Sequence, residues 1–234
     1  MTKKEKLLYL LSLLLVVVLV LPGCNVSVNK SVHIEDGETV DGGRSSVNGN
    51  IIIGSDCTVK GSCSTVNGRI KVGSNSDVRG LKTVNSGISV GEKTIVDGNV
   101  STVNGSISFK AGAKVDGDAS TINGSITCGS GTKINGDATT VNGGIELKNT
   151  TVKEDIKTHN GDITLQEEST VFGDIIIKDS HSLSRRVRTL KITIADKSVV
   201  KGDIIVKDDD LKVKVYLSNG GKVNGRIKNA EVVE

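Results

Sequence analysis

Few residues in this chain have the types and spacing that chemistry requires. Its three histidines are His33, His159 and His181, and two of them occupy places in a repeat that is described below. His181 lies in a loop outside the repeat, and one histidine without a fixed carboxylate partner is weak evidence for a general base. The chain has no CxxC pair and no Cys/His spacing typical of a metal site. We therefore expect a protein that is not an enzyme and that holds no cofactor.

Three of the four cysteines take positions that are small or apolar elsewhere in the same repeat. Cys63 aligns with Leu81, Cys128 aligns with Phe109, and Cys57 aligns with small residues. We expect all three to be buried as small apolar side chains. A disulfide between Cys57 and Cys63 is the alternative in an oxidising envelope, although the two positions fall on different strands of one turn.

Aspartates recur beside glycines, as they do in Ca²⁺-binding solenoids. Lys, Arg, Asn and Ser share the same positions in other turns, so we expect no convergence of ligands and no metal site. The triplet 208–210 is flanked by lysines, and we expect it to be solvated. The recurrent aspartates are Asp97, Asp116, Asp118, Asp137, Asp155, Asp162, Asp174 and Asp203.

One basic cluster is suited to binding a partner. Arg185, Arg186, Arg188 and Lys191 lie within or beside an interruption of the repeat. Such a patch suits the phosphate groups of lipids or an anionic envelope polysaccharide; a solvated surface loop is the alternative. The formal net charge is only +3 and aromatic residues make up 2% of the chain. Nucleic-acid binding needs a basic stripe with stacking aromatic side chains, so no nucleic-acid partner is expected.

The first 24 residues differ from the rest. Lys3, Lys4 and Lys6 precede an apolar run over residues 7–21, which is followed by small residues and Cys24. This order is typical of an export signal, and the run is shorter than the roughly 20 residues that span a bilayer. An uncleaved membrane anchor is the alternative.

The segment Leu21-Pro22-Gly23-Cys24 resembles the lipobox of bacterial lipoproteins. The resemblance implies a signal peptide over residues 1–23 and lipidation of Cys24, which then becomes the first residue of the mature chain. Acyl chains contribute about 0.8 kcal/mol per buried methylene, so two or three hold a protein stably on a membrane. The expected location is the bacterial cell envelope. Asn25 stands where some Gram-negative lipoproteins of the inner membrane carry aspartate, which favours the outer membrane.

A repeat of 18 or 19 residues organises the remaining chain. An asparagine, usually followed by glycine, recurs at this spacing, and aliphatic residues stand three and five positions after it. Two further apolar columns follow in each turn, as in Val59 and Cys63. The repeated asparagines are Asn48, Asn67, Asn85, Asn104, Asn123, Asn142 and Asn160. The first aliphatic column is Ile51, Ile70, Ile88, Ile107, Ile126, Ile145 and Ile163.

The spacing predicts a β-solenoid. Apolar residues two apart are typical of a strand with one buried face, and the glycines between columns suit turns. A unit this short cannot bury its own apolar face and must stack on its neighbours. We therefore predict an all-β, single-stranded parallel β-helix of about ten turns, one domain over residues 24–234. Insertions are expected at 178–190 and 207–214, and the stacked asparagines are expected to form a side-chain amide ladder.

Turns such as VDGDAST, VKGDIIV and VNGRIK resemble those of bactofilins, which are polymer-forming bacterial proteins with a right-handed β-helix. The VNGSI phrase also resembles the repeats of exported putative-adhesin β-solenoids. The resemblance implies right-handed winding; a left-handed hexad solenoid is the alternative. Together with the export signal it implies a non-enzymatic, lipid-anchored scaffold of the envelope that self-assembles through the solenoid ends into a homo-oligomer or polymer. A surface adhesin or a glycan- or protein-binding module is the second expectation.

Overall fold

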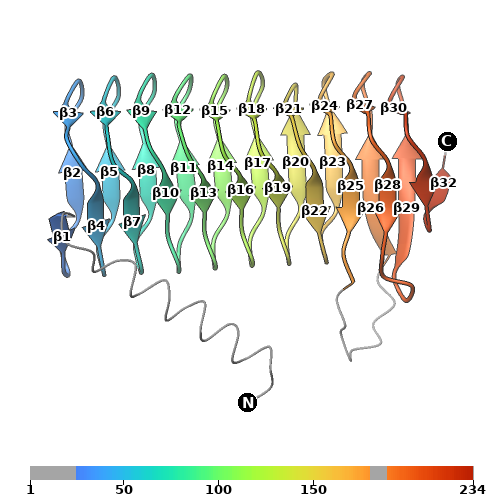
Figure 1. The fold of residues 1–234 in the computed structure, drawn as a ribbon, viewed down its shortest axis with the longest axis horizontal. Helices are drawn as coiled ribbons and strands as arrows, with labels where there is room; N and C mark the ends of the chain where they lie inside the picture. Colours follow the sequence, from blue (N-terminus) through green and yellow to red (C-terminus); the bar gives the residue numbers. More distant parts are fainter. Residues whose placement is uncertain (1–24, 180–188, 234) are drawn as a thin grey trace, which may run out of the picture.

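The computed structural model describes residues 25–179 and 189–233, and every regular element in these ranges is a β-strand. The strands form three parallel sheets, called here A, B and C, that run the length of a rod (Figure 1). Sheet A consists of β1 (Asn25–Ser27), β4 (Arg44–Ser46), β7 (Cys63–Thr65), β10 (Leu81–Lys82), β13 (Val100–Ser101), β16 (Ala119–Ser120), β19 (Ala138–Thr139), β22 (Ile156–Thr158), β25 (Ile175–Ile177), β28 (Ile204–Val206) and β31 (Ile227–Lys228). Sheet B consists of β2 (Val32–Ile34), β5 (Ile51–Ile53), β8 (Ile70–Val72), β11 (Ile88–Val90), β14 (Ile107–Phe109), β17 (Ile126–Cys128), β20 (Ile145–Lys148), β23 (Ile163–Gln166), β26 (Thr189–Ile194), β29 (Lys212–Leu217) and β32 (Glu231–Val233). Sheet C consists of β3 (Thr39–Val40), β6 (Thr58–Val59), β9 (Asp77–Val78), β12 (Ile95–Val96), β15 (Lys114–Val115), β18 (Lys133–Ile134), β21 (Thr151–Val152), β24 (Thr170–Val171), β27 (Val199–Val200) and β30 (Lys222–Val223).

The chain visits the sheets in the fixed order A, B, C, so each set of three strands is one coil of a solenoid. Sheet C has 10 strands and sheets A and B have 11 each, which gives ten complete coils followed by two more strands. The predicted fold class and number of turns are therefore confirmed. The right-handed winding stays a prediction.

The apolar columns form one continuous core inside the rod. In sheet B, Ile51 pairs with Ile70, which pairs with Ile88, and the three side chains are 0%, 0% and 2% exposed. Stacking equal residues in this way buries an apolar face that a single coil leaves open. Phe109 is the bulkiest of the fully buried side chains in the described part of the chain.

The repeated asparagines form the predicted amide ladder along the corner between sheets A and B. In each step the Nδ2 group of one asparagine donates to the Oδ1 atom of its equivalent in the preceding coil, as Asn123 does to Asn104 at 2.8 Å. The donor–acceptor distances range from 2.5 to 3.3 Å. The ladder runs through Asn29, Asn48, Asn67, Asn85, Asn104, Asn123, Asn142 and Asn160.

A second ladder, formed by buried threonines of sheet A, lies beside the first. The Thr121 hydroxyl donates to the Gly105 carbonyl of the preceding coil at 2.8 Å, and Thr140 bonds to Gly124 in the same way. Thr158 occupies the next step, but its Oγ1 atom is buried and has no hydrogen-bond partner among the described residues. A buried hydroxyl without a partner retains its full desolvation penalty.

Replacing Thr158 with valine is therefore expected to stabilise the rod by about 1 kcal/mol, because it removes an unsatisfied hydroxyl and keeps the shape of the side chain. The matched change Thr121→Val is expected to destabilise the rod by roughly 1–2 kcal/mol, because a made hydrogen bond is lost. Urea unfolding followed by circular dichroism measures both. If both substitutions changed the free energy of unfolding by the same amount, the Thr121 hydroxyl would not be hydrogen-bonded and the Thr158 hydroxyl unsatisfied as the structure shows.

β26 begins at Thr189 and β29 at Lys212, so the last residues of the two predicted insertions, 178–190 and 207–214, belong to sheet B. Leu190 and Val213 pair with each other and are 1% and 2% exposed. They extend the core of sheet B by one layer, which explains why these two strands are longer than the others.

Candidate functional site

Of the residues that the sequence marks for function, only Lys191 lies in the described ranges. Cys24, Arg185, Arg186 and Arg188 lie outside the described residues. Lys191 is exposed on β26, and its backbone N–H donates to the Asp162 side chain at 3.0 Å.

Lys191 belongs to a row of charges along one border of sheet B. It pairs in register with Lys214, which pairs with Glu231, and the Lys214 ammonium lies 3.2 Å from the Glu231 carboxylate. The acidic segment 207–211 precedes β29, and residues 180–188 precede β26. β26 and β29 are neighbours in sheet B, and segment 207–211 lies at the border where β29 begins (Figure 1).

In the ranges that the structure describes, the histidines and cysteines do not converge on a catalytic arrangement. His33 is exposed on β2, as predicted, and His159 is half-buried beside β22. Cys57, Cys63 and Cys128 are buried, as predicted, and no disulfide joins Cys57 to Cys63. Burial raises the pKa of the Cys128 thiol, which disfavours the nucleophilic thiolate.

Carboxylates form a third ladder, along the corner between sheets C and A. The Oδ1 atom of each aspartate accepts the backbone N–H of its equivalent in the next coil, as Asp155 does from Asp174 at 2.8 Å. The pattern resembles helix capping, in which a side-chain oxygen satisfies a backbone donor. This aspartate ladder consists of Asp118, Asp137, Asp155, Asp174 and Asp203.

Two members of the aspartate ladder lie close to a third acid, although no convergence of acids was expected from the sequence. Carboxylate oxygens of Asp118, Asp137 and Glu154 lie within 4.8 Å of one another, and oxygen ligands of this kind suit a hard cation such as Ca²⁺. Two of the three carboxylates already accept backbone N–H groups. Lys157 further neutralises Asp137, at 2.5 Å, so the cluster has a structural explanation without a metal.

Cations hold parts of the aspartate ladder in place. Burial disfavours the charge on Lys157, but its hydrogen bonds to Asp137 and Asp155 outweigh that effect and raise its pKa. At the other end, the hydrogen bond from Lys228 and the backbone N–H of Arg226 hold the pKa of Asp203 below its usual value. Within the described residues, Asp118 and Asp174 are the members of the ladder without an ion pair.

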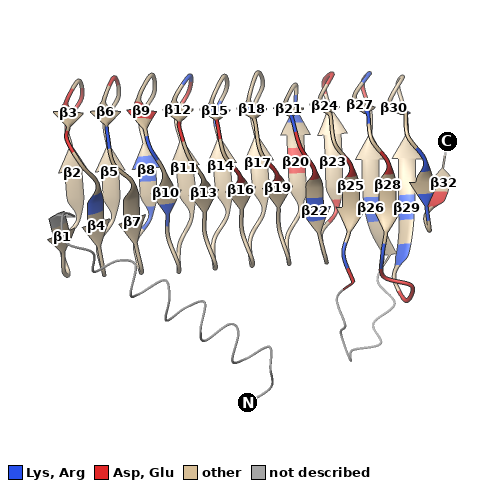
Figure 2. Ribbon diagram, viewed as in Figure 1, with Lys and Arg blue, Asp and Glu red and all other residues tan. Residues whose placement is uncertain are grey.

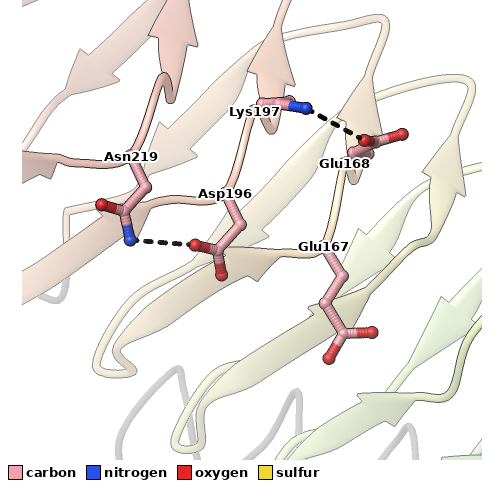
Figure 3. A pocket seen from close by; sticks show the side chains of 5 residues that line it. All are labelled: Glu167, Glu168, Asp196, Lys197 and Asn219. Atoms are coloured by element: carbon pink, nitrogen blue, oxygen red, sulfur yellow. Dashed lines mark hydrogen bonds and ion pairs between the residues drawn. The ribbon is translucent and has the colours of Figure 1, made fainter.

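A shallow open pocket lies at the corner between sheets B and C in the late coils (Figure 3). Asn219 donates to Asp196 at 3.0 Å, and Lys197 lies 3.9 Å from Glu168, whereas Glu167 points away from both pairs. All five residues adopt a positive φ, between 48° and 63°. Residues other than Gly, Asn and Asp rarely adopt this backbone conformation. The pocket is open and is lined by charged and amide residues, unlike the enclosed sites that hold small ligands.

An exposed aromatic side chain on the flank of sheet C is the second local feature. Phe172 follows β24 and is 40% exposed. The Lys153 and Lys201 ammonium groups, one from the preceding coil and one from the following coil, lie 4.1 and 3.7 Å from its ring centre. Such cation–π contacts contribute about 0.5–1 kcal/mol each at exposed sites.

Comparison of the chain with protein-family models, curated proteins and solved structures found no match. In the described ranges, no helix is long and apolar enough to cross a membrane. The described residues form a rigid rod with side-chain ladders along its corners and unpaired strand edges at both ends.

Proposed function

We propose that this chain is a non-enzymatic structural protein of the bacterial envelope, lipid-anchored through Cys24, whose rods assemble end to end. The contrast between the inner coils and the last coil carries the proposal. Val223, Ile227 and Val232 occupy inward columns, but the first two are half-exposed and Val232 is 44% exposed. Their equivalents one coil earlier, Val200, Ile204 and Val215, are 0% exposed.

The backbone at both ends is open as well. β30, β31 and β32 each have a neighbour on one side only, as do β1, β2 and β3 at the other end of the rod. Exposed strand edges are templates for pairing with another chain. A second copy placed head to tail continues sheets A and B, with its β1 on β31 and its β2 on β32, whereas sheet C, which has one strand fewer, is interrupted by one strand position at the junction. This pairing covers the open apolar columns of sheets A and B.

The position of the anchor determines how such a filament lies. Cys24 immediately precedes β1, so each lipid anchor is expected at the first coil of its rod. Rods joined end to end can all keep their anchors in one bilayer only when the filament lies along the membrane surface. A scaffold or coat parallel to the membrane fits this arrangement, and the three unbroken sheets provide its stiffness.

Negative-stain electron microscopy of the full chain in detergent tests the assembly. Filaments many rods long are expected for the natural chain, and single rods for the double change Val223→Lys and Val232→Lys. Ile95→Lys is the control, because Ile95 is an exposed apolar residue on the flank of the rod. Single rods at every concentration of the natural chain would rule out end-to-end assembly. Palmitate labelling in bacteria tests the anchor, and labelling that survives Cys24→Ser would contradict it.

A further inference from the structure

The late coils carry two parallel lines of opposite charge on adjacent flanks of the rod. Lys153, Phe172 and Lys201 stand in one column beside sheet C, and Lys133 of β18 and Lys222 of β30 lie one coil before and one coil after it, in the column two residues earlier. In the described part of the chain none of these lysines has an ion pair. We call this group the lysine stripe; it consists of Lys133, Lys153, Lys201 and Lys222 with Phe172. In the three central coils the aspartate ladder lies two residues after Lys153, Phe172 and Lys201, and residues of both signs occur along the late coils in Figure 2.

The aspartate ladder beside the lysine stripe determines which kind of partner this surface can bind. A polyanion such as nucleic acid or an acidic polysaccharide would be attracted by the lysine stripe but repelled by Asp174, the carboxylate beside its centre that has no ion pair in the described residues. A partner with charges of both signs, arranged in the same two lines, is attracted along both. A second copy of this chain has this arrangement, with the same spacing between coils of about 4.8 Å. Complementary potentials of this kind select partners and fix their register.

Apolar side chains complete the surface. Ile176 and Ile205 pair with each other on the outer side of sheet A, just past the aspartate ladder, and both are half-buried. The same outward column carries hydroxyl side chains at Ser101, Ser120 and Thr139 in earlier coils. Lys157 precedes the two isoleucines in this column and Lys228 follows them, so the apolar pair lies in the coils next to Phe172. Apolar residues gathered in one part of an otherwise polar flank indicate a contact surface.

We propose that two copies of this chain associate side by side through this corner, with their rods parallel and their N-terminal ends on the same side. Symmetry determines the direction. A two-fold axis parallel to the rods places the lysine stripe of each copy against the aspartate ladder of the other, at equal height. A two-fold axis across the rods places stripe against stripe and ladder against ladder, which is repulsive. Only the first arrangement gives a self-complementary dimer interface.

Asp174 and Phe172 lie at the centre of this contact. Asp174 has no ion pair in the described residues, and it belongs to the same coil as Phe172. The coils before and after it supply Lys153 and Lys201. In the parallel pair, the Asp174 carboxylate of each copy lies between the two ammonium groups that flank the other copy's Phe172. The edge of an aromatic ring is its positive part and also favours a carboxylate.

The contact covers roughly 24 Å of rod at 4.8 Å per coil, so it is small and is expected to be weak in dilute solution. Two rods held on one membrane are at a high effective concentration, which favours a weak pairing. The parallel direction places both N-terminal ends at the same end of the pair. The pairing goes beyond the proposed end-to-end assembly and uses different residues, so either can fail while the other holds.

Cysteine cross-linking of the full chain in neutral phosphatidylcholine vesicles tests the pairing. Treatment of Phe172→Cys with a short bismaleimide cross-linker is expected to give cross-linked dimers severalfold faster than treatment of Ile95→Cys, whose side chain is also exposed but lies on β12, in an earlier coil of sheet C. Adding Val232→Lys to the Phe172→Cys chain blocks the end of the rod, and we expect it to leave the yield of cross-linked dimers unchanged. Equal rates for the two cysteine variants would overturn the proposal.

Charge exchange tests the direction of the contact. In the Phe172→Cys background, the double change Lys153→Glu and Lys201→Glu is expected to reduce dimer formation about tenfold, as is Asp174→Lys, because each places like charges opposite each other. Mixing the two altered chains is expected to restore dimers to the original yield, since each then offers the charges that the other lacks. Circular dichroism confirms that both altered chains fold. A mixture that forms no more dimer than either chain alone would overturn the parallel arrangement.

Discussion

Replacing Phe109 with alanine is expected to destabilise the rod by about 3–5 kcal/mol. The side chain is 1% exposed in β14, between Val90 and Cys128 of the neighbouring coils. Removing it leaves a cavity that the surrounding backbone cannot fill, because every strand there is hydrogen-bonded on both sides. Urea unfolding of the purified chain measures the change.

The other phenylalanine of the chain is the matched control. Phe172 is 40% exposed and contacts two lysines rather than the core. Phe172→Ala is expected to cost about 1–2 kcal/mol, the sum of two exposed cation–π contacts. If the two alanine variants were equally stable, Phe109 would not be packed as the structure shows.

The change Gly124→Ala is expected to destabilise the rod by roughly 3 kcal/mol or more. Gly124 follows an asparagine of the amide ladder, and a Cβ atom at this position would overlap the backbone carbonyl of Gly105 in the preceding coil. That carbonyl also accepts the hydrogen bond of Thr121. The two coils would have to separate, which breaks contacts in all three sheets.

Gly80→Ala provides the comparison for this prediction. A Cβ atom at Gly80 would lie 3.1 Å from the Ser62 hydroxyl oxygen, a side-chain atom that can move. We expect this substitution to change the free energy of unfolding by less than about 1 kcal/mol. Thermal unfolding of both variants tests the difference, and a Gly124→Ala chain as stable as the natural one would contradict the close contact between coils at this corner.

Much of this fold was predictable because the solenoid makes each position visible many times. The Ile column of sheet B and the asparagine column recur at nearly constant spacing, so the strands, the core and the amide ladder follow from counting. The predicted exposure of His33 and burial of the cysteines followed from the same alignment and are confirmed. A single occurrence of any of these residues would have carried no such information.

The features that sequence analysis missed depend on how side chains meet across coils. The aspartate column contains Asn99 in an early coil and Arg226 in the last, and such mixed occupancy suggested that the acids do not converge. The dipeptide Gly-Asp, at Gly117-Asp118, Gly136-Asp137 and Gly173-Asp174, was the signal that could have revealed the ladder. The first insertion hid the alignment of Lys201 with Phe172 and Lys153, because it changes the spacing from 19 to 29 residues.

The uniform pairing of neighbouring coils has a consequence for how such a protein changes its length. Each inner coil contacts only the coil before it and the coil after it, through equal residues at equal heights. Loss or duplication of one whole unit, such as residues 106–124, keeps every type of contact and removes or adds about 4.8 Å of rod. The length of the rod can therefore vary by slippage within its own gene, while an insertion or deletion of one or two residues would disrupt every column.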